Sequence, residues 1–177
     1  DSQYQIFEEL KLNNHFSFSG PTSLGKSFII ESFIKYIISK DKKNIIVLVP
    51  TRALINQVTL KLKKSLADNN DYKILSHPII PDFFRNSSDK YIFVFTPERL
   101  LAYLSLDNPP IEYLFIDEAQ KIISPKDSRS PLYYHAILQA QKKTIKLYFS
   151  SPNIPNPEVF LQLFEKSTEE SLSIKNS

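Results

Sequence analysis

Short and nearly continuous apolar runs recur along the chain and alternate with longer segments of helical periodicity. Runs such as IIVLV at 45–49 and YLFI at 113–116 have no alternating polar positions, which is typical of strands buried on both faces. Their alternation with helices indicates an α/β fold in which a mostly parallel sheet carries helices on both faces. The expected strands are 16–19, 44–49, 73–75, 91–95, 113–116 and 145–149, and the expected helices are 26–39, 54–66, 97–103 and 132–141.

The size and composition fit one globular domain. The 177 residues are 42% hydrophobic and 23% charged, and no apolar run approaches the ~20 residues that a membrane span needs. The absence of cysteine excludes disulfides, thiolate metal sites and a cysteine nucleophile. The net charge of +3 is compatible with nucleic-acid binding, although lysines on solvated helix faces are the commoner explanation of such a charge.

The ends of the chain bear on its organisation. The chain starts at Asp1 and contains no methionine, so we expect it to be a piece of a longer protein. We predict a compact domain over 1–166, followed by a polar, serine-rich stretch over 167–177 that forms a tail or the start of an interdomain linker. We expect a cytoplasmic protein without membrane contact.

The chain has only two glycines, Gly20 and Gly25, and both lie in one short loop. This loop, SGPTSLGKS at 19–27, fits the pattern G-x-x-x-x-G-K-[ST] between a strand and a helix, where backbone N–H groups surround phosphates. A chance match is the alternative, and the confinement of both glycines to the loop argues against it. The expected nucleotide-binding residues are Gly20, Pro21, Thr22, Ser23, Leu24, Gly25, Lys26 and Ser27.

Specific roles follow from the chemistry of such a loop. Lys26 is expected to neutralise the β- and γ-phosphates and to take part in catalysis, and the Ser27 hydroxyl is expected to bind Mg²⁺. The string FIDEAQ at 115–120 then places two carboxylates at the end of a buried strand. We expect Asp117 to bind the nucleotide's Mg²⁺ and Glu118 to activate the attacking water. Adjacent acidic residues after a strand are often only a turn or a helix cap, but their combination with the loop favours a hydrolytic nucleotide site.

Two further strand ends share one design, a buried strand followed by threonine, proline and an early arginine. VPTRAL at 49–54 and FTPERL at 95–100 both lead into predicted helices, whose N-termini attract phosphate. Each alone is simply a good helix start. Together with the phosphate loop they form a row along one sheet edge, which suits the backbone phosphates of a DNA or RNA strand. The residues expected to contact nucleic acid are Pro50, Thr51, Arg52, Thr96, Pro97 and Arg99.

The order of these four strings resembles the motif I, Ia, Ib and II series of superfamily 2 helicases of the DEAD/DEAH type. This resemblance covers nearly the whole chain and implies a RecA-like P-loop NTPase fold that uses ATP and Mg²⁺. It also implies a second RecA-like domain in the same full-length chain, which supplies an arginine finger. Gln3 precedes Lys26 by about 23 residues, the spacing at which this family places the glutamine that reads adenine.

The string FSSPNIPNPEVF at 149–160 resembles the family's Ser-Ala-Thr motif and, through IPNPE, the Ski2-like helicases. Ser150 matches that motif, whereas Ser151 replaces its alanine and Pro152 its threonine. Gln120 stands where the family has Asp or His. By resemblance, Ser150, Ser151 and Gln120 are expected to couple hydrolysis to strand movement, with an incomplete hydroxyl pair.

The function favoured is therefore an ATP-dependent nucleic-acid helicase, of which this chain is the ATP-binding motor domain. A duplex translocase, remodelling enzyme or restriction-type ATPase that does not separate strands would carry the same motifs. A P-loop kinase would need an acceptor pocket and a lid, which the row of phosphate-binding strand ends does not suggest. A nucleotide-gated scaffold without hydrolysis is favoured only by Pro152, and the Asp117–Glu118 pair argues against it.

Overall fold

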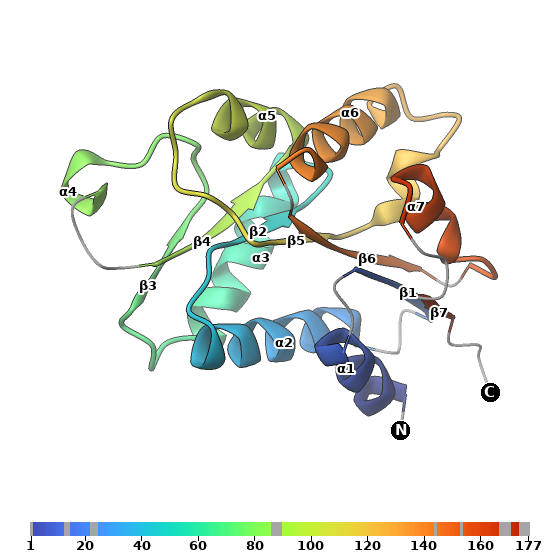
Figure 1. Ribbon diagram of the computed structural model, residues 1–177, viewed down its shortest axis with the longest axis horizontal. Helices are drawn as coiled ribbons and strands as arrows, with labels where there is room; N and C mark the ends of the chain where they lie inside the picture. Colours follow the sequence, from blue (N-terminus) through green and yellow to red (C-terminus); the bar gives the residue numbers. More distant parts are fainter. Residues whose placement is uncertain are drawn as a thin grey trace.

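A single parallel sheet forms the centre of the protein (Figure 1). The computed structural model describes residues 2–12, 15–21, 25–85, 90–143, 145–152, 154–166 and 171–173. In space the seven strands follow the order β3-β4-β2-β5-β6-β1-β7, and every neighbouring pair is parallel. The strands are β1 (Phe16–Gly20), β2 (Ile45–Leu48), β3 (Tyr72–Leu75), β4 (Lys90–Phe95), β5 (Tyr113–Ile116), β6 (Lys146–Pro152) and β7 (Ser171–Ser173).

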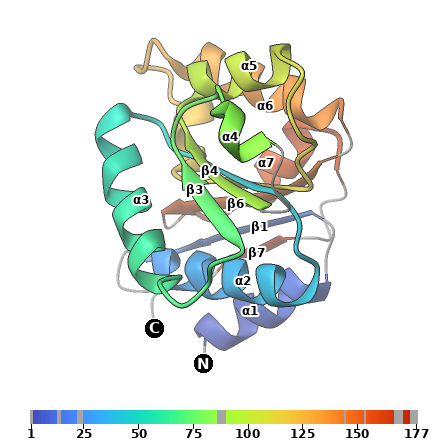
Figure 2. The same cartoon turned by 90° about the vertical axis from the view of Figure 1, so that its left-hand side faces the viewer.

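Helices cover both faces of this sheet, which confirms the predicted α/β class. Figure 2 shows α1 and α2 below the sheet and α5 and α6 above it, with α3 along the side of the lower layer. The helices of the lower layer are α1 (Ser2–Leu12), α2 (Lys26–Lys40) and α3 (Arg52–Ser65). Those of the upper layer are α5 (Pro97–Ser105), α6 (Ser130–Gln141) and α7 (Glu158–Leu163).

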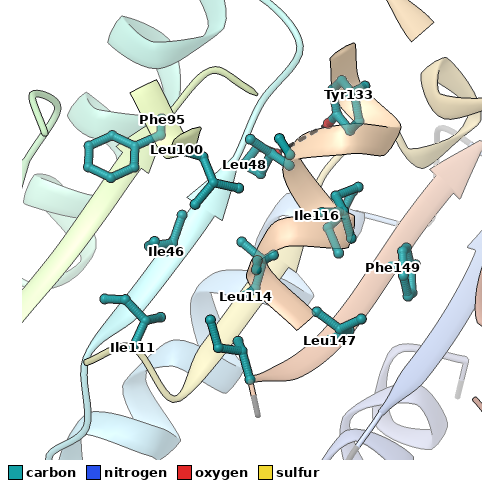
Figure 3. Close-up of a cluster of buried hydrophobic side chains, with 14 of the residues drawn as sticks. Ile46, Leu48, Phe95, Leu100, Ile111, Leu114, Ile116, Tyr133, Leu147 and Phe149 are labelled. Carbon is teal, nitrogen blue, oxygen red and sulfur yellow. Dashed lines mark hydrogen bonds between the residues drawn. The ribbon is translucent and has the colours of Figure 1, made fainter. Parts of the chain in front are cut away.

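The two hydrophobic cores follow from strand geometry, because successive side chains point to opposite faces. Ile45 and Val47 pack with α2 and α3, whereas Ile46 and Leu48 pack with α5 and α6. Figure 3 shows this second core, in which Leu100 and Tyr133 lie over β2, β5 and β6. Full burial of each such aliphatic side chain stabilises the fold by about 1.5–3 kcal/mol.

Several elements differ from the sequence prediction. The helix α1, the short helix α4 (Asp82–Arg85), the 3₁₀ turn η2 (Ala119–Ile122), α7 and β7 were not expected. Most of them are six residues or shorter, too short for a clear periodicity. β7 lies inside the stretch predicted to be a polar tail and pairs with β1 through Phe18 and Leu172.

The all-parallel arrangement fixes where functional side chains can gather. Every loop that follows a strand emerges at the carboxyl edge of the sheet, where ligands of α/β proteins bind. The segments after β1, β2, β4, β5 and β6 therefore meet along one edge. Within the described residues, no helix is long and apolar enough to cross a membrane.

Candidate nucleotide and nucleic-acid site

The phosphate loop leaves β1 at the carboxyl edge and enters α2. Thr22, Ser23 and Leu24, which were expected to bind nucleotide, lie outside the described residues. Gly25 adopts a left-handed conformation with φ 76° and ψ 48°, which favours glycine. A Cβ atom there would lie only 2.5 Å from the Gln3 side-chain nitrogen. The backbone conformation therefore favours glycine at this position, whereas the Gln3 amide is the end of a flexible side chain and could shift away from a Cβ atom.

Gln3 lies in the first turn of α1 and lines a hollow between α1 and α2. The hollow has a cavity volume of about 250 Å³ and is also lined by Tyr4, Phe7, Phe28, Ile29 and Ser32. Phe28 is 63% exposed and follows Ser27 directly. Small-ligand sites usually measure about 300–1,000 Å³, so this partly apolar hollow has room for only part of a ligand. The structure thus places Gln3 next to the loop, as the resemblance implies.

Lys26 is the first residue of α2, and its side chain turns toward the end of β6. Its Nζ donates a hydrogen bond to the Ser151 carbonyl at 3.1 Å. This approach follows from register, since Ser19 of β1 pairs with Ser151. Burial lowers the pKa of Lys26, and the charges of Glu118 and Asp117 oppose that shift. The ammonium is therefore held by a neutral acceptor and faces two carboxylates.

Asp117 follows β5 and is fixed through its own backbone. Its N–H donates to the Leu48 carbonyl at 2.9 Å, and its carbonyl accepts from the Tyr133 hydroxyl at 2.5 Å. Burial and the neighbouring Glu118 charge raise the pKa of Asp117 to about 6. A hydrogen bond from the Glu118 N–H and the charges of Lys26 and Lys61 oppose this rise. A nearby cation would restore the ionised form of this carboxyl group.

Ser27 and Asp117 line the same cavity, between α2 and α3. These two oxygen ligands fit Mg²⁺, which is usually bound by one or two protein groups together with water and substrate phosphates. No cluster of three or more His, Cys, Asp or Glu side chains occurs among the residues that the structure describes. The donor set therefore fits a metal that arrives with a nucleotide better than a metal bound by protein alone.

Glu118 has a backbone conformation that is unusual for a residue other than glycine. Its φ of 53° and ψ of 48° lie in the left-handed region, where such residues are uncommon and often functional. Its Oε2 accepts a hydrogen bond from Gln120 Nε2. Three buried polar atoms nearby in the fold, Gln120 Oε1, Ser150 Oγ and Ser151 Oγ, have no hydrogen-bond partner in the described part of the chain. Sequence reasoning placed all four residues at this edge, but it gave no sign of this backbone conformation.

The two threonine-proline strand ends lie side by side, because β2 pairs with β4. Thr51 and Arg52 are exposed at the start of α3, whereas Pro50 is buried. Thr96 is only 3% exposed, and Pro97 is buried with it. The two strand ends are therefore adjacent, and the Thr51–Arg52 end contributes most of their exposed surface. That they bind phosphates of a nucleic acid stays a prediction.

Arg99 has a partner inside the protein. Its Nη1 donates to the Ser76 carbonyl at 2.6 Å and so ties α5 to the loop after β3. A phosphate contact by Arg99 would have to use its remaining N–H groups, which a guanidinium has in sufficient number. The role of Arg99 in nucleic-acid binding stays a prediction.

Sequence reasoning missed Tyr133 at this edge and the pairing of Arg129, a residue whose position resembles one in the Ski2-like helicases. Tyr133 is fully buried in α6 and supports the Asp117 backbone, but in the sequence it is one more apolar position of a helix. Arg129 pairs with Glu98 at 2.7 Å and links the start of α6 to the start of α5. Neither contact has a local sequence signal, because the partners are separated by 16 and 31 positions.

Comparisons with known proteins agree with this geometry. The model of the DEAD/DEAH box helicase family matches residues 1–158. "Anti-bacteriophage protein B" of Escherichia coli is 31% identical over 68% of this chain and 15% of its own length. "ATP-dependent RNA helicase DBP6" of Kluyveromyces lactis is 30% identical over 70% of this chain and 22% of its own length.

Solved structures share the fold. The helicase domain of Pyrococcus furiosus Hef superposes with a TM-score of 0.71 at 17% identity, over 99% of this chain and 38% of that one. The DUF1998 helicase MrfA bound to DNA gives 0.68 at 18% identity, over 98% and 27%. The chain thus spans well under half of each relative and has their RecA-like helicase fold. With the family model matching most of its length, this chain belongs to the DEAD/DEAH box helicase family.

Proposed function

We propose that the chain is the ATP-binding motor domain of an ATP-dependent nucleic-acid helicase. The observation that carries this proposal is the convergence of Lys26, Ser27, Asp117 and Glu118 at one sheet edge, from two strands that are separated only by β6. Family membership and the DNA-bound neighbour MrfA support it. Because one relative is described as an RNA helicase, the strand that this protein binds is proposed to be either DNA or RNA.

The residues divide the hydrolytic work among them. Lys26 has two N–H donors beyond its bond to the Ser151 carbonyl, which would bind the β- and γ-phosphates, and Gln3 would contact the base. Ser27 and Asp117 would hold Mg²⁺, which would neutralise charge on the phosphates. Glu118 accepts a proton from the attacking water. The loop of Gly20, Pro21, Thr22, Ser23, Leu24 and Gly25 is proposed to enclose the phosphates with the backbone N–H groups of all its residues except Pro21, which has none.

The strand groove is proposed to run along the starts of α3 and α5. Its phosphate contacts are proposed to come from the exposed Thr51 and Arg52 at the first helix and from Arg99 at the second, whereas the buried Pro50, Thr96 and Pro97 shape the two helix starts. Movement is proposed to reach this groove through the coupling residues Ser150, Ser151 and Gln120. A second RecA-like domain in the same protein supplies the opposite wall. The motor domain is proposed to cover 1–166, and β7 of the following stretch adds an edge strand to its sheet. The protein acts in the cytoplasm, and Ski2-like helicases are the nearest proposed subgroup.

The direct test is nucleotide binding by matched lysine variants on one helix. Lys26→Ala is expected to lower ATP affinity by at least tenfold, or ~1.4 kcal/mol. Lys35→Ala removes an exposed lysine from the same helix and should leave the affinity within about twofold. Fluorescent-nucleotide titration measures both. Equal affinities of two folded variants would exclude the phosphate-loop assignment.

The second test separates the motor domain from the complete motor. ATPase rates of the full-length protein are measured with single- and double-stranded DNA and RNA, beside strand-displacement assays. Residues 1–177 alone should hydrolyse ATP about 10³ to 10⁵ times more slowly, because a second domain supplies the charge-stabilising arginine. Robust nucleic-acid-stimulated hydrolysis by a monomer of 1–177 would contradict the two-domain proposal.

A further inference from the structure

The residue that follows the acidic pair by two positions contacts the proposed base. Gln120 Nε2 donates a hydrogen bond to Glu118 Oε2 within the turn η2. Two features of the backbone bring the side chains together. Glu118 is left-handed, and the Lys121 N–H donates to the Glu118 carbonyl at 3.0 Å, which closes the turn. The side chain of Gln120 therefore folds back over Glu118.

The frame that carries Gln120 is rigid. Ala119 is 0% exposed and Ile122 is 5% exposed, so residues on both sides of Gln120 are packed into the core over α6 and β6. Side chains of a turn held at both ends have little freedom to leave their partners. The position of the Gln120 amide is thus set by apolar packing, and the amide in turn sets the position of the carboxylate.

The polarity of the contact matches the role of a base. An ionised carboxylate only accepts hydrogen bonds, and the amide nitrogen only donates them. If the amide were turned over, its oxygen would face a carboxylate oxygen, so Glu118 also fixes the amide orientation. The Gln120 oxygen is then left buried without a partner among the described residues. A buried acceptor without a partner lowers the stability of the fold by about 1–3 kcal/mol. Such a loss is tolerated where the residue has a function.

We propose that Gln120 is a positioning residue that holds the Glu118 carboxylate in the orientation from which it accepts the water proton. This inference rests on the proposed ATPase function and assigns a specific part of it. A carboxylate on a left-handed residue at an open edge would otherwise sample several rotamers, and each misplaced rotamer lowers the rate of proton transfer. Gln120 is not among the residues that we assign to the nucleotide phosphates, so its removal should act on turnover and not on binding.

The test uses three variants at position 120 and one matched control in the full-length protein. Gln120→Ala removes the donor and should lower kcat by about 10- to 100-fold, with KM and ATP affinity within about twofold. Gln120→Glu keeps the size, removes the donor and adds a repelling charge, so the loss should be larger. Gln120→His restores an N–H donor and should recover part of the rate. Gln141→Ala is the control, because Gln141 also has a buried, unpartnered Oε1 but lies at the end of α6.

A second measurement does not depend on hydrolysis. In an ¹H–¹⁵N spectrum of residues 1–177, the Gln120 side-chain amide is assigned by its loss in Gln120→Ala. Its hydrogens should exchange slowly with water, and Glu118→Ala should accelerate that exchange. Unchanged exchange in Glu118→Ala, or kcat within twofold of wild type in both Gln120→Ala and Gln120→Glu, overturns the assignment. A wild-type protein without any ATPase contradicts the proposed function instead, and the amide exchange then decides whether Gln120 holds Glu118.

Discussion

The two edges of the sheet differ in how completely their polar groups are paired. At the amino edge, the Asn44 side chain accepts from the Tyr91 N–H at 2.9 Å and donates to the Pro110 carbonyl at 3.0 Å. Its own N–H donates to the Glu112 carboxylate, also at 2.9 Å. One buried asparagine therefore ties β2 to β4 and to the segment before β5.

The carboxyl edge has the opposite character. It holds the left-handed Glu118 and three buried polar atoms without partners among the described residues, whereas the end of α6 at the amino edge has one such atom, Gln141 Oε1. Strain and unpaired buried groups each cost about 1–3 kcal/mol. They persist where a ligand or a chemical step makes use of them. The amino edge thus stabilises the fold, and the carboxyl edge leaves more polar groups available to a ligand.

The largest expected effect breaks activity at the carboxyl edge and leaves the fold intact. In the full-length protein, Glu118→Gln should lower ATP turnover by at least a hundredfold, because an amide cannot accept the water proton. ATP affinity should stay within about threefold of the wild-type value. The urea concentration at the midpoint of unfolding should not change. Steady-state ATPase and nucleotide titration measure this. Turnover within about tenfold of wild type, or ~1.4 kcal/mol of barrier, would show that Glu118 is not the base.

The next largest effect is a lower free energy of unfolding, caused by a substitution at the amino edge. Asn44→Ala leaves the Tyr91 N–H and the Pro110 carbonyl without their side-chain partners, so unfolding should become easier by about 2–4 kcal/mol. Urea denaturation gives this value. Asn56→Ala, at an exposed position of α3, is the control and should stay within about 0.5 kcal/mol. Similar losses in the two variants would remove the distinction between a buried network and ordinary surface asparagines.

A smaller effect compares left-handed residues at the two edges. Lys42 has a φ of 51° just after the end of α2, a position where glycine is preferred. Lys42→Gly should stabilise the protein by about 0.5–1 kcal/mol without affecting ATPase activity, since its exposed pairing with Asp71 contributes little. Glu118→Gly should relieve similar strain and abolish hydrolysis. Thermal unfolding and ATPase rates are measured for both variants. They test whether backbone strain is functional at Glu118, on the carboxyl edge, and without function at Lys42, on the amino edge.

The smallest effect concerns pH at the amino edge. His15 Nδ1 accepts from the Leu147 N–H at 3.0 Å, and burial together with the charges of Lys166 and Lys146 lowers its pKa to about 4. The folded state then binds fewer protons than the unfolded state between about pH 4 and 6.5. Its stability contribution is complete above pH 6.5 and is lost as the pH falls toward 4. His15→Asn keeps an acceptor and does not titrate, so the unfolding midpoint should depend less on pH in that window.

The sequence predicts the sheet well and the details of the site only in part. Apolar runs such as 45–49 identify strands because burial on both faces excludes polar alternation. The Asp117–Glu118 pair and Lys26 were placed by motif spacing. The Tyr133 contact to Asp117 and the Arg99 contact to Ser76 depend on tertiary approach, which no local pattern encodes. The left-handed backbone of Glu118 was also hidden, because glutamate does not favour that region.

The hydrogen bond from Lys26 to the Ser151 carbonyl is made before any nucleotide is present. It uses one of the three N–H donors of the ammonium, so two donors remain for phosphate oxygens and the carbonyl can hold the side chain in place throughout. A free lysine side chain has about 2 kcal/mol of rotamer entropy to lose when it is fixed. If Lys26 is the phosphate-binding lysine that we propose, part of this entropy is lost on folding and not on binding. The β6 carbonyl would then raise nucleotide affinity by preorganisation of the lysine.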